Sequence, residues 1–164
     1  MPSKNIRYVD VIIVGAGVIG ASIAYHLSLN GVKNILVVES NPEAGKGSTC
    51  RATGGYRGQF GSKINVQLSL ISRQKLIDFK YEHGIDPGYL PAGYIFAAEN
   101  TSEMTSLTLA NSLQQSCGLR DAMLVSSDDI RKLNPHINSE NILGGSFCQS
   151  DGFIKPMNIL QGYI

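Results

Sequence analysis

A glycine turn directly after an apolar run constrains this chain more than any other feature. Residues 11–14 are all aliphatic and lead into the sequence Gly-Ala-Gly-Val-Ile-Gly at 15–20, after which a helical pattern begins. Gly15 permits a tight turn at the end of a strand, and Gly17 lets the backbone approach a pyrophosphate because it has no Cβ. Gly20 lets the helix pack closely on the strand, and the helix N-terminus presents free N–H groups and a positive dipole end to phosphates. The turn therefore predicts a phosphate-binding site.

A second apolar run, residues 35–38, ends in Glu39, which follows Gly20 by nineteen residues. A carboxylate at the tip of this strand can accept hydrogen bonds from both ribose hydroxyls of an adenosine. Strand, glycine turn, helix, strand and acid together have the layout of a dinucleotide-binding βαβ unit. The alternative is a structural glycine turn without a ligand, because the glycine pattern alone is weak evidence.

The composition is that of a globular protein and gives no reason to expect a nucleic acid or a membrane as partner. Of 164 residues, 43% are hydrophobic and 16% charged, and 14 Lys and Arg against 13 Asp and Glu leave a net charge of +1. Cys50, Cys117 and Cys148 form no CxxC pair, so we expect neither a metal site nor a disulfide framework. Asp10, the phased glycines and the helical pattern that follows them argue against a signal-peptide core in the apolar stretch 11–24. This stretch is also too short to span a bilayer. The sequence predicts a cytoplasmic protein.

The first half of the chain predicts a βαβ unit, a loop and a long helix. The loop covers residues 41–61 and is polar and glycine-rich, and a loop of this length is more often functional than accidental. Ser62 is the predicted N-cap of the long helix. The predicted elements are strands at 9–14 and 35–39 and helices at 18–30 and 63–82. The residues predicted to face inward are Ile19, Ile23, Ala24 and Leu27 on the first helix and Ile64, Leu68, Ile71, Leu76 and Phe79 on the second.

The second half predicts a mixed α/β portion. Its expected strands are 94–98, 123–125 and 142–148, and its expected helices are 101–117, capped by Thr101, 127–133, and a last helix that starts at Pro156. A nicotinamide-binding domain would follow Glu39 with a helix and a third parallel strand, whereas here a glycine-rich loop and a long helix intervene. This interruption favours FAD over NAD as the cofactor.

With these features placed, the chain resembles the FAD-dependent amine and amino-acid oxidoreductases of the D-amino-acid oxidase type. Sarcosine oxidase β subunits look nearest, and dimethylglycine and proline dehydrogenases and glycine oxidase are also similar. The loop is the most specific part of the match, and the resemblance covers the whole chain. The stretches that carry it are 10–20 with 25–27, 37–39, 47–60, 93–95 and 151–156.

The resemblance implies a Rossmann-like FAD-binding βαβ unit followed by the beginning of a mixed α+β substrate domain. The implied division is 1–84 for the FAD-binding part, 85–150 for the substrate domain and 151–164 for a segment that returns to the FAD domain. The implied reaction is flavin-mediated removal of hydride from the C–N bond of a small amino acid or N-methyl amino acid. The residues that would hold FAD are Gly15, Ala16, Gly17, Val18, Ile19 and Gly20 at the pyrophosphate, Glu39, Ser40 and Asn41 at the adenosine, and Ser48, Thr49, Arg51, Ala52, Thr53, Gly54 and Gly55 along the loop.

Arg57 occupies the position where relatives place an arginine beside the flavin ring. A cation there would stabilise an anionic reduced flavin or a substrate carboxylate, and the other interpretation is a plain surface arginine. Gln59 is a candidate for a hydrogen bond to the ring edge. The loop contains no histidine, so a covalent histidyl–flavin link is not supported. Lys155 stands where many relatives have an acid or an amide, which puts a direct substrate role of that motif in doubt.

The chain is expected to be incomplete, because two parallel strands and one crossover helix cannot bury both faces of a doubly wound sheet. It would then be the N-terminal part of a longer enzyme, or a half that pairs with a partner. We expect a small amino-acid substrate, and either a homo-oligomer or other subunits of a heteromeric oxidase as protein partners. Two other functions stay open: an NAD(P)-dependent dehydrogenase and a non-catalytic FAD-binding subunit.

Overall fold

The computed structural model describes residues 8–164, and they form two compact units. Unit 1 contains residues up to Gly54, Phe79–Pro87 and Lys155–Ile164, and unit 2 contains Gly55–Asp78 and Gly88–Ile154. This division groups 55–78 with the second part of the chain, whereas the sequence assigned them to the FAD-binding part. The predicted domain boundaries stay a prediction, and each unit is described by itself.

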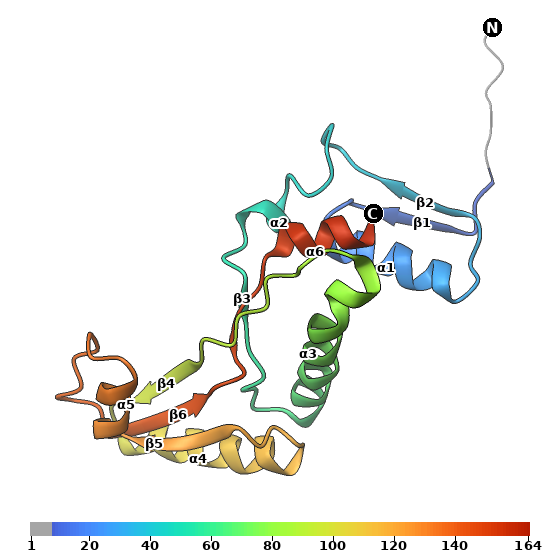
Figure 1. The fold of residues 1–164 in the computed structure, drawn as a ribbon. Coiled ribbons are helices and arrows are strands. Elements are labelled where there is room, and N and C mark those ends of the chain that lie inside the picture. The colour runs from blue at the N-terminus through green and yellow to red at the C-terminus, as the bar shows by residue number, and fades with distance from the viewer. Residues whose placement is uncertain (1–7) are drawn as a thin grey trace, which may run out of the picture. The chain divides into compact units, whose positions relative to one another are not determined.

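Unit 1 is built on the expected βαβ arrangement (Figure 1). Strands β1 (Val11–Val14) and β2 (Ile35–Val38) pair in parallel, and helix α1 (Val18–Leu29) connects them. The register pairs Val14 with Val38, so the two strands end level with each other. The α/β fold class is therefore confirmed, and the ends of both strands lie at the glycine turn.

Two further helices and one helix end complete unit 1. Helix α2 (Ser48–Arg51) and helix α6 (Pro156–Tyr163) contact each other, and α6 also contacts α1. The long helix α3 (Lys63–His83) belongs to unit 1 only from Phe79 onward. There the rings of Phe79 and His83 lie 4.2 Å apart, and Tyr163 lies 5.2 Å from Phe79. Aromatic packing thus joins the last turn of α3 to α6.

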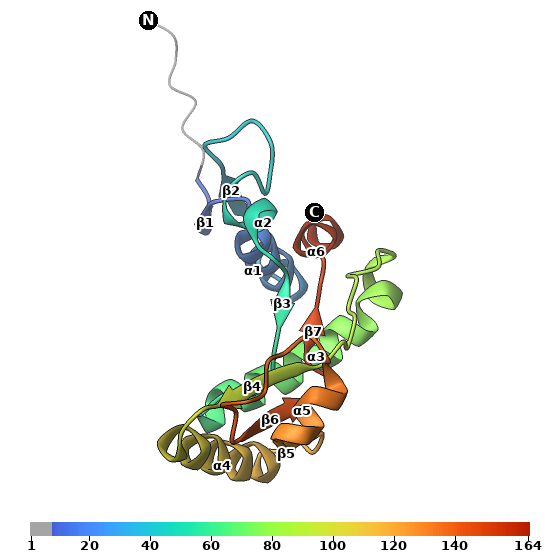
Figure 2. The same ribbon diagram turned by 90° about the vertical axis from the view of Figure 1, so that its left-hand side faces the viewer.

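Unit 2 contains a three-stranded antiparallel sheet in the order β4–β6–β5. Strands β3 and β7 form a separate, short antiparallel pair, and Figure 2 shows these two strands side by side. The part of α3 that precedes Phe79 and the helices α4 and α5 complete the unit. The bounds are β3 (Gly55–Tyr56), β4 (Tyr94–Ala98), α4 (Thr101–Ser116), β5 (Ala122–Ser126), α5 (Ser127–Leu133), β6 (Gly144–Cys148) and β7 (Gly152–Phe153).

The two faces of the β4–β6–β5 sheet pack against different helices because side chains alternate along each strand. On one face Ala122 and Cys148 meet Val66 of α3 and Leu119, and all four are buried. The other face carries Val125 and Phe147, which pack on Ile130 of α5, and Ile95, Ile137 and Ile142 surround them. These two clusters form the core of unit 2.

The predicted elements are largely confirmed, but the loop 41–61 is not free of secondary structure. It contains α2 and β3. One predicted helix cap is wrong: the cap of α4 is Asn100, whose side chain accepts a hydrogen bond from the Glu103 N–H at 3.0 Å, and Thr101 is already helical. Ser62 directly precedes α3 and its carbonyl accepts from the Val66 N–H at 3.1 Å, as expected at an N-cap, but its buried hydroxyl makes no hydrogen bond within residues 8–164.

The predicted inward faces of α1 and α3 are wrong in part. Ile19 is 71% exposed, and on α3 Ile64 is 60% exposed, whereas Val66 is fully buried. Helix α3 carries two apolar stripes with helical spacing, and both satisfy the same sequence pattern. The stripe that contains Val66 is the one that meets Leu119 in the core.

Replacing Leu119 by alanine is expected to lower the free energy of unfolding of unit 2 by about 2–5 kcal/mol, because Leu119 is 1% exposed and the change leaves a cavity. The matched control is Leu109→Ala on α4, where the leucine is 68% exposed and the expected change is below about 0.5 kcal/mol. Urea unfolding followed by circular dichroism measures both. Equal effects of the two substitutions would contradict the assigned core.

Candidate functional site

The glycine turn between β1 and α1 has the close approach that the sequence predicts. Gly15 has φ 101°, which only glycine adopts readily, and its N–H donates to the Val38 carbonyl at 2.7 Å. A Cβ on Gly20 would collide with the carbonyl oxygen of Gly15. A Cβ on Gly17 would lie 2.9 Å from the Thr49 hydroxyl oxygen. The positions of Gly17 and Gly20 are therefore too crowded for a side chain, and Gly15 is required by its backbone conformation, as expected of a phosphate-binding turn.

Glu39 lies directly at this turn. Its Oε2 accepts a hydrogen bond from the Ala16 N–H at 2.9 Å. Its Oε1 accepts bonds from the Asn41 N–H and the Asn41 side-chain amide, each at 2.9 Å, and from the Ser40 hydroxyl at 3.2 Å. The backbone bond from Asn41, followed by that from Ala16, lowers the pKa of Glu39 to about 2. The predicted proximity of Glu39 to the glycine turn is thus confirmed.

The N-terminus of α1 is the second part of the arrangement. The Val18 N–H donates to the Thr49 hydroxyl at 3.0 Å, and Thr49 is 8% exposed. The Gly45 N–H donates to the Ala16 carbonyl at 3.0 Å, so the loop that carries α2 is held against the glycine turn. Backbone N–H groups, a hydroxyl and a helix N-terminus suit the phosphates of a dinucleotide, and Glu39 suits its ribose. The residues of unit 1 therefore fit the ADP half of FAD.

The structure brings most of the predicted FAD residues into unit 1. Gly15–Gly20 form the turn and the first turn of α1, and Ser40 and Asn41 bind the Glu39 carboxylate. Their roles toward FAD stay predictions. Ser48, Thr49 and Arg51 lie on α2, Ala52, Thr53 and Gly54 follow it, and Gly55 and Arg57 belong to unit 2.

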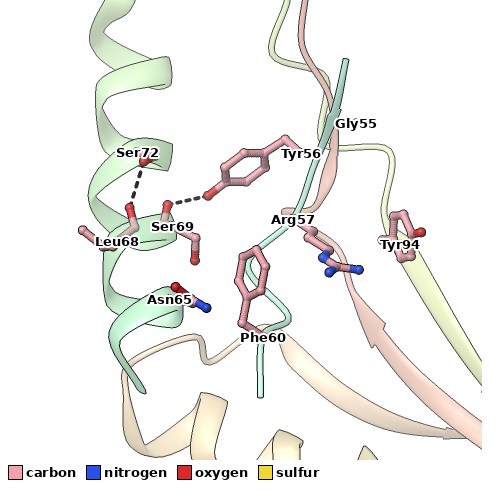
Figure 3. Close-up of a pocket in the computed structure, with 9 residues that line it drawn as sticks. All are labelled: Gly55, Tyr56, Arg57, Phe60, Asn65, Leu68, Ser69, Ser72 and Tyr94. Atoms are coloured by element: carbon pink, nitrogen blue, oxygen red, sulfur yellow. Dashed lines mark hydrogen bonds between the residues drawn. The ribbon is translucent and has the colours of Figure 1, made fainter. Parts of the chain in front are cut away.

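Arg57 lies at a cavity of about 610 Å³ in unit 2, and Figure 3 shows it projecting toward Tyr94. Its guanidinium carbon is 4.9 Å from the centre of the Phe60 ring and 5.3 Å from that of Phe96, which are cation–π distances. The Tyr56 hydroxyl donates to the Ser69 carbonyl across the cavity at 2.5 Å. The lining residues are Gly55, Tyr56, Arg57, Phe60, Asn65, Leu68, Ser69, Ser72 and Tyr94.

The lining contains no acidic side chain, and within residues 8–164 Arg57 forms no ion pair. Burial raises the pKa of the Tyr56 hydroxyl, which keeps this group neutral. Arg57 is therefore the cation available to an anionic ligand in this cavity. The arrangement supports a binding role for Arg57 over a plain surface position.

Gln59 has a role that the sequence did not predict. Its side-chain Nε2 donates to the Tyr94 carbonyl at 3.0 Å and to Asp151 at 3.1 Å, and its Oε1 accepts from the Ser146 hydroxyl at 2.5 Å. Gln59 is 5% exposed. Because both ends of the amide are occupied inside unit 2, Gln59 is not available for the expected bond to a flavin ring edge. The sequence also did not predict that Asp151 is buried, although the stretch 151–156 that contains it is part of the family resemblance.

Residues 10–164 match the FAD dependent oxidoreductase family. The chain belongs to this family. FAD is the cofactor of the family, so the predicted cofactor and the predicted family are confirmed. Among the described residues 8–164, no group of histidine, cysteine and acidic side chains could hold a metal ion, and no helix is long and apolar enough to cross a membrane.

The matches to curated relatives and to solved structures extend over almost all of the chain. It is 32% identical to FAD-dependent oxidoreductase domain-containing protein 1 of Xenopus laevis, over 94% of this chain and 33% of that protein. It is 29% identical to the formaldehyde-forming 4-methylaminobutanoate oxidase of Paenarthrobacter nicotinovorans, over 91% of this chain and 18% of that protein. L-proline dehydrogenase from P. horikoshii has a similar fold, with a TM-score of 0.85 at 22% identity, over 96% of this chain and 41% of that chain. The chain thus spans less than half of each protein that it matches here.

Replacing Gly20 by alanine is expected to lower the free energy of unfolding of unit 1 by about 1–3 kcal/mol, because the new methyl group would meet the Gly15 carbonyl and force the backbone to move. Gly61→Ala is the control, since a Cβ there has nothing within 4 Å and the expected change is below about 0.5 kcal/mol. Urea unfolding measures both. A stable Gly20→Ala protein with an unchanged glycine turn would refute the close approach.

The bond between Glu39 and the Ala16 N–H is expected to survive acid that protonates an ordinary glutamate. A lowered pKa means that the bond stabilises the fold fully above pH 4.5 and is lost as the pH falls toward 2. In a pH titration followed by NMR, the Ala16 amide resonance should stay constant through pH 4.5 and change only near 2. A midpoint near 4.5 would show that Glu39 does not hold this amide.

Proposed function

We propose that this chain supplies the ADP-binding part of an FAD-dependent oxidoreductase that oxidises the C–N bond of a small amino acid or N-methyl amino acid to an imine. The observation that carries the proposal is the position of Glu39, 2.9 Å from the Ala16 N–H at the glycine turn. A ribose-binding acid and a diphosphate-binding turn are only useful together if they lie next to each other.

The residues of unit 1 bind and orient the cofactor in this proposal. The N–H groups at the start of α1 and the Thr49 hydroxyl bind the diphosphate, and the helix dipole favours its negative charge. Glu39 accepts hydrogen bonds from the adenosine ribose. In the structure Ser40 and Asn41 occupy its Oε1, so ribose hydroxyls replace these local donors when the nucleotide binds. FAD, when bound, supplies the group that accepts a hydride from the substrate.

Arg57 binds negative charge at the cavity of unit 2. Phe60 and Phe96 hold its guanidinium in place, and the absence of acidic residues from the lining leaves the cation free for an anion. Both a substrate carboxylate and an anionic reduced flavin suit this position. The name of the 4-methylaminobutanoate oxidase supports the substrate class, because methylaminobutanoate carries a secondary amine and a carboxylate.

FAD is expected to bind this chain, and Glu39→Gln is expected to weaken binding about tenfold, because the neutral amide makes weaker hydrogen bonds to ribose than the carboxylate. The control is Glu43→Gln, which changes an exposed acid that pairs with Lys46. Titration of FAD followed by quenching of flavin fluorescence gives the dissociation constants. Binding of NADH in preference to FAD would instead support an NAD(P)-dependent dehydrogenase.

The reaction itself is tested in the full-length enzyme with FAD bound. Anaerobic mixing with sarcosine, dimethylglycine, glycine or proline should bleach the flavin absorbance with at least one of them. Bound FAD that no amine reduces would support a non-catalytic FAD-binding subunit. The substrate, the oligomeric state and the cytoplasmic location stay predictions.

A further inference from the structure

Asp151 is a fully buried carboxylate in unit 2, at 0% exposure. It lies just before β7, and its Oδ1 accepts a hydrogen bond from the Gly58 N–H at 2.6 Å. Its Oδ2 accepts a bond from the Gln59 side chain at 3.1 Å. Among residues 8–164 no lysine or arginine forms an ion pair with it. A buried acid without a cationic partner is costly, and burial raises the pKa of Asp151 while these two donors oppose the rise.

Both donors come from the two residues that follow Arg57. Gly58 is held through its backbone N–H, and Gln59 is held through its side chain to Asp151, the Tyr94 carbonyl and the Ser146 hydroxyl. Four hydrogen bonds therefore attach the segment after Arg57 to the β4–β6–β5 sheet and to Asp151, which directly precedes β7. Such a connected network has little freedom to adopt another arrangement.

The segment before Arg57 is held by the residues that follow Asp151. Gly55 pairs with Phe153 and Tyr56 pairs with Gly152 in the β3–β7 ladder. Residues 151–153 thus fix the chain on both sides of Arg57, through the Asp151 carboxylate on one side and backbone pairing on the other. Arg57 itself is exposed, and its guanidinium lies over the rings of Phe60 and Phe96.

We infer that Asp151 is a positioning residue: its buried carboxylate sets the path of the backbone at Gly58 and Gln59 and thereby places the Arg57 guanidinium at the cavity of unit 2. This inference rests on the ligand-binding role proposed for Arg57. Asp151 does not touch the cavity, because the lining does not include it. Its effect on Arg57 passes through Gly58 and Gln59.

A carboxylate is needed at this position because both of its partners are donors. The Gly58 N–H and the Gln59 Nε2 each require an acceptor oxygen. Asparagine offers one oxygen and one NH₂ group, so one partner would face another donor. To avoid this, the Gln59 amide would have to turn over. The Ser146 hydroxyl could then accept from the NH₂ group, but the amide oxygen would face the Tyr94 carbonyl oxygen, and two acceptors cannot form a hydrogen bond. Asp151→Asn therefore disturbs the segment with almost no change in volume.

The test is an NMR comparison of the 164-residue chain with its Asp151→Asn variant. In the native chain the ring currents of Phe60 and Phe96 should shift the Arg57 Nε–H resonance, and the short bond to Asp151 should shift the Gly58 amide downfield. Both shifts should be lost in the variant. Amide resonances of β5 should stay unchanged. The matched control is Asp128→Asn, an exposed aspartate that pairs with Arg131 on α5, and it should leave the Arg57 resonance in place.

Measuring how a small carboxylate binds distinguishes a positioning role of Asp151 from a merely structural one. Sodium acetate serves as the probe, and its effect on the Arg57 resonance gives a dissociation constant that should rise about tenfold in Asp151→Asn. Ser146→Ala removes one bond to Gln59 and should cause a smaller displacement in the same direction, which supplies the test if Asp151→Asn does not fold.

The outcomes are distinct. A displaced Gly58 amide with an unmoved Arg57 resonance and unchanged acetate affinity would overturn the inference. If the native protein ignores acetate but Asp151→Asn still displaces Arg57, the positioning stands and the carboxylate-binding role of Arg57 is overturned. If Arg57 moves and acetate affinity falls while the free energy of unfolding matches that of the control, the inference is supported.

Discussion

The hydrogen bond between the Ala16 N–H and Glu39 is the interaction on which the proposed nucleotide site of unit 1 depends. It exists because β1 and β2 pair in parallel with their ends level, so that the residue after β2 meets the turn after β1. The acid, the glycine turn and the N-terminus of α1 then form one site, and Thr49 joins the loop to the same helix end. Without this pairing, Glu39 would be an ordinary surface acid and the glycine turn an ordinary connection. Membership of the FAD dependent oxidoreductase family agrees with this geometry.

In unit 2 the position of Arg57 at the cavity is fixed by contacts that do not neutralise its charge. An acidic partner beside Arg57 would fix its position and at the same time cancel its charge. The structure instead uses two phenyl rings against the guanidinium and a buried network two residues away. The carboxylate of that network binds neutral donors, so the charge of Arg57 remains available to a ligand.

Local patterns in the sequence predicted most of the elements and failed where two solutions were equally good locally. The strand, turn, helix and strand around Gly15–Gly20 carry unambiguous signals, and the structure confirms them. On α3 two apolar stripes compete, and the sequence favoured the one with Ile64, which is exposed. Gln59 was a candidate for a hydrogen bond to the flavin ring edge, but three partners within unit 2 bind its amide. For α3 and Gln59 the deciding partner is distant in sequence: Leu119 for Val66 and Asp151 for Gln59.

The sequence by itself determined the βαβ unit, the glycine turn and the acid at the end of the second strand. It could do so because these features depend on backbone sterics at glycine and on periodicity within about 30 residues. Only the tertiary structure decided which face of α3 is buried, which residues hold the chain around Arg57, and that no lysine or arginine among residues 8–164 pairs with Asp151. These depend on contacts such as that between Gly58 and Asp151, which lie 93 residues apart. No local pattern encodes such a contact, because its energy comes from burial that only the assembled fold provides.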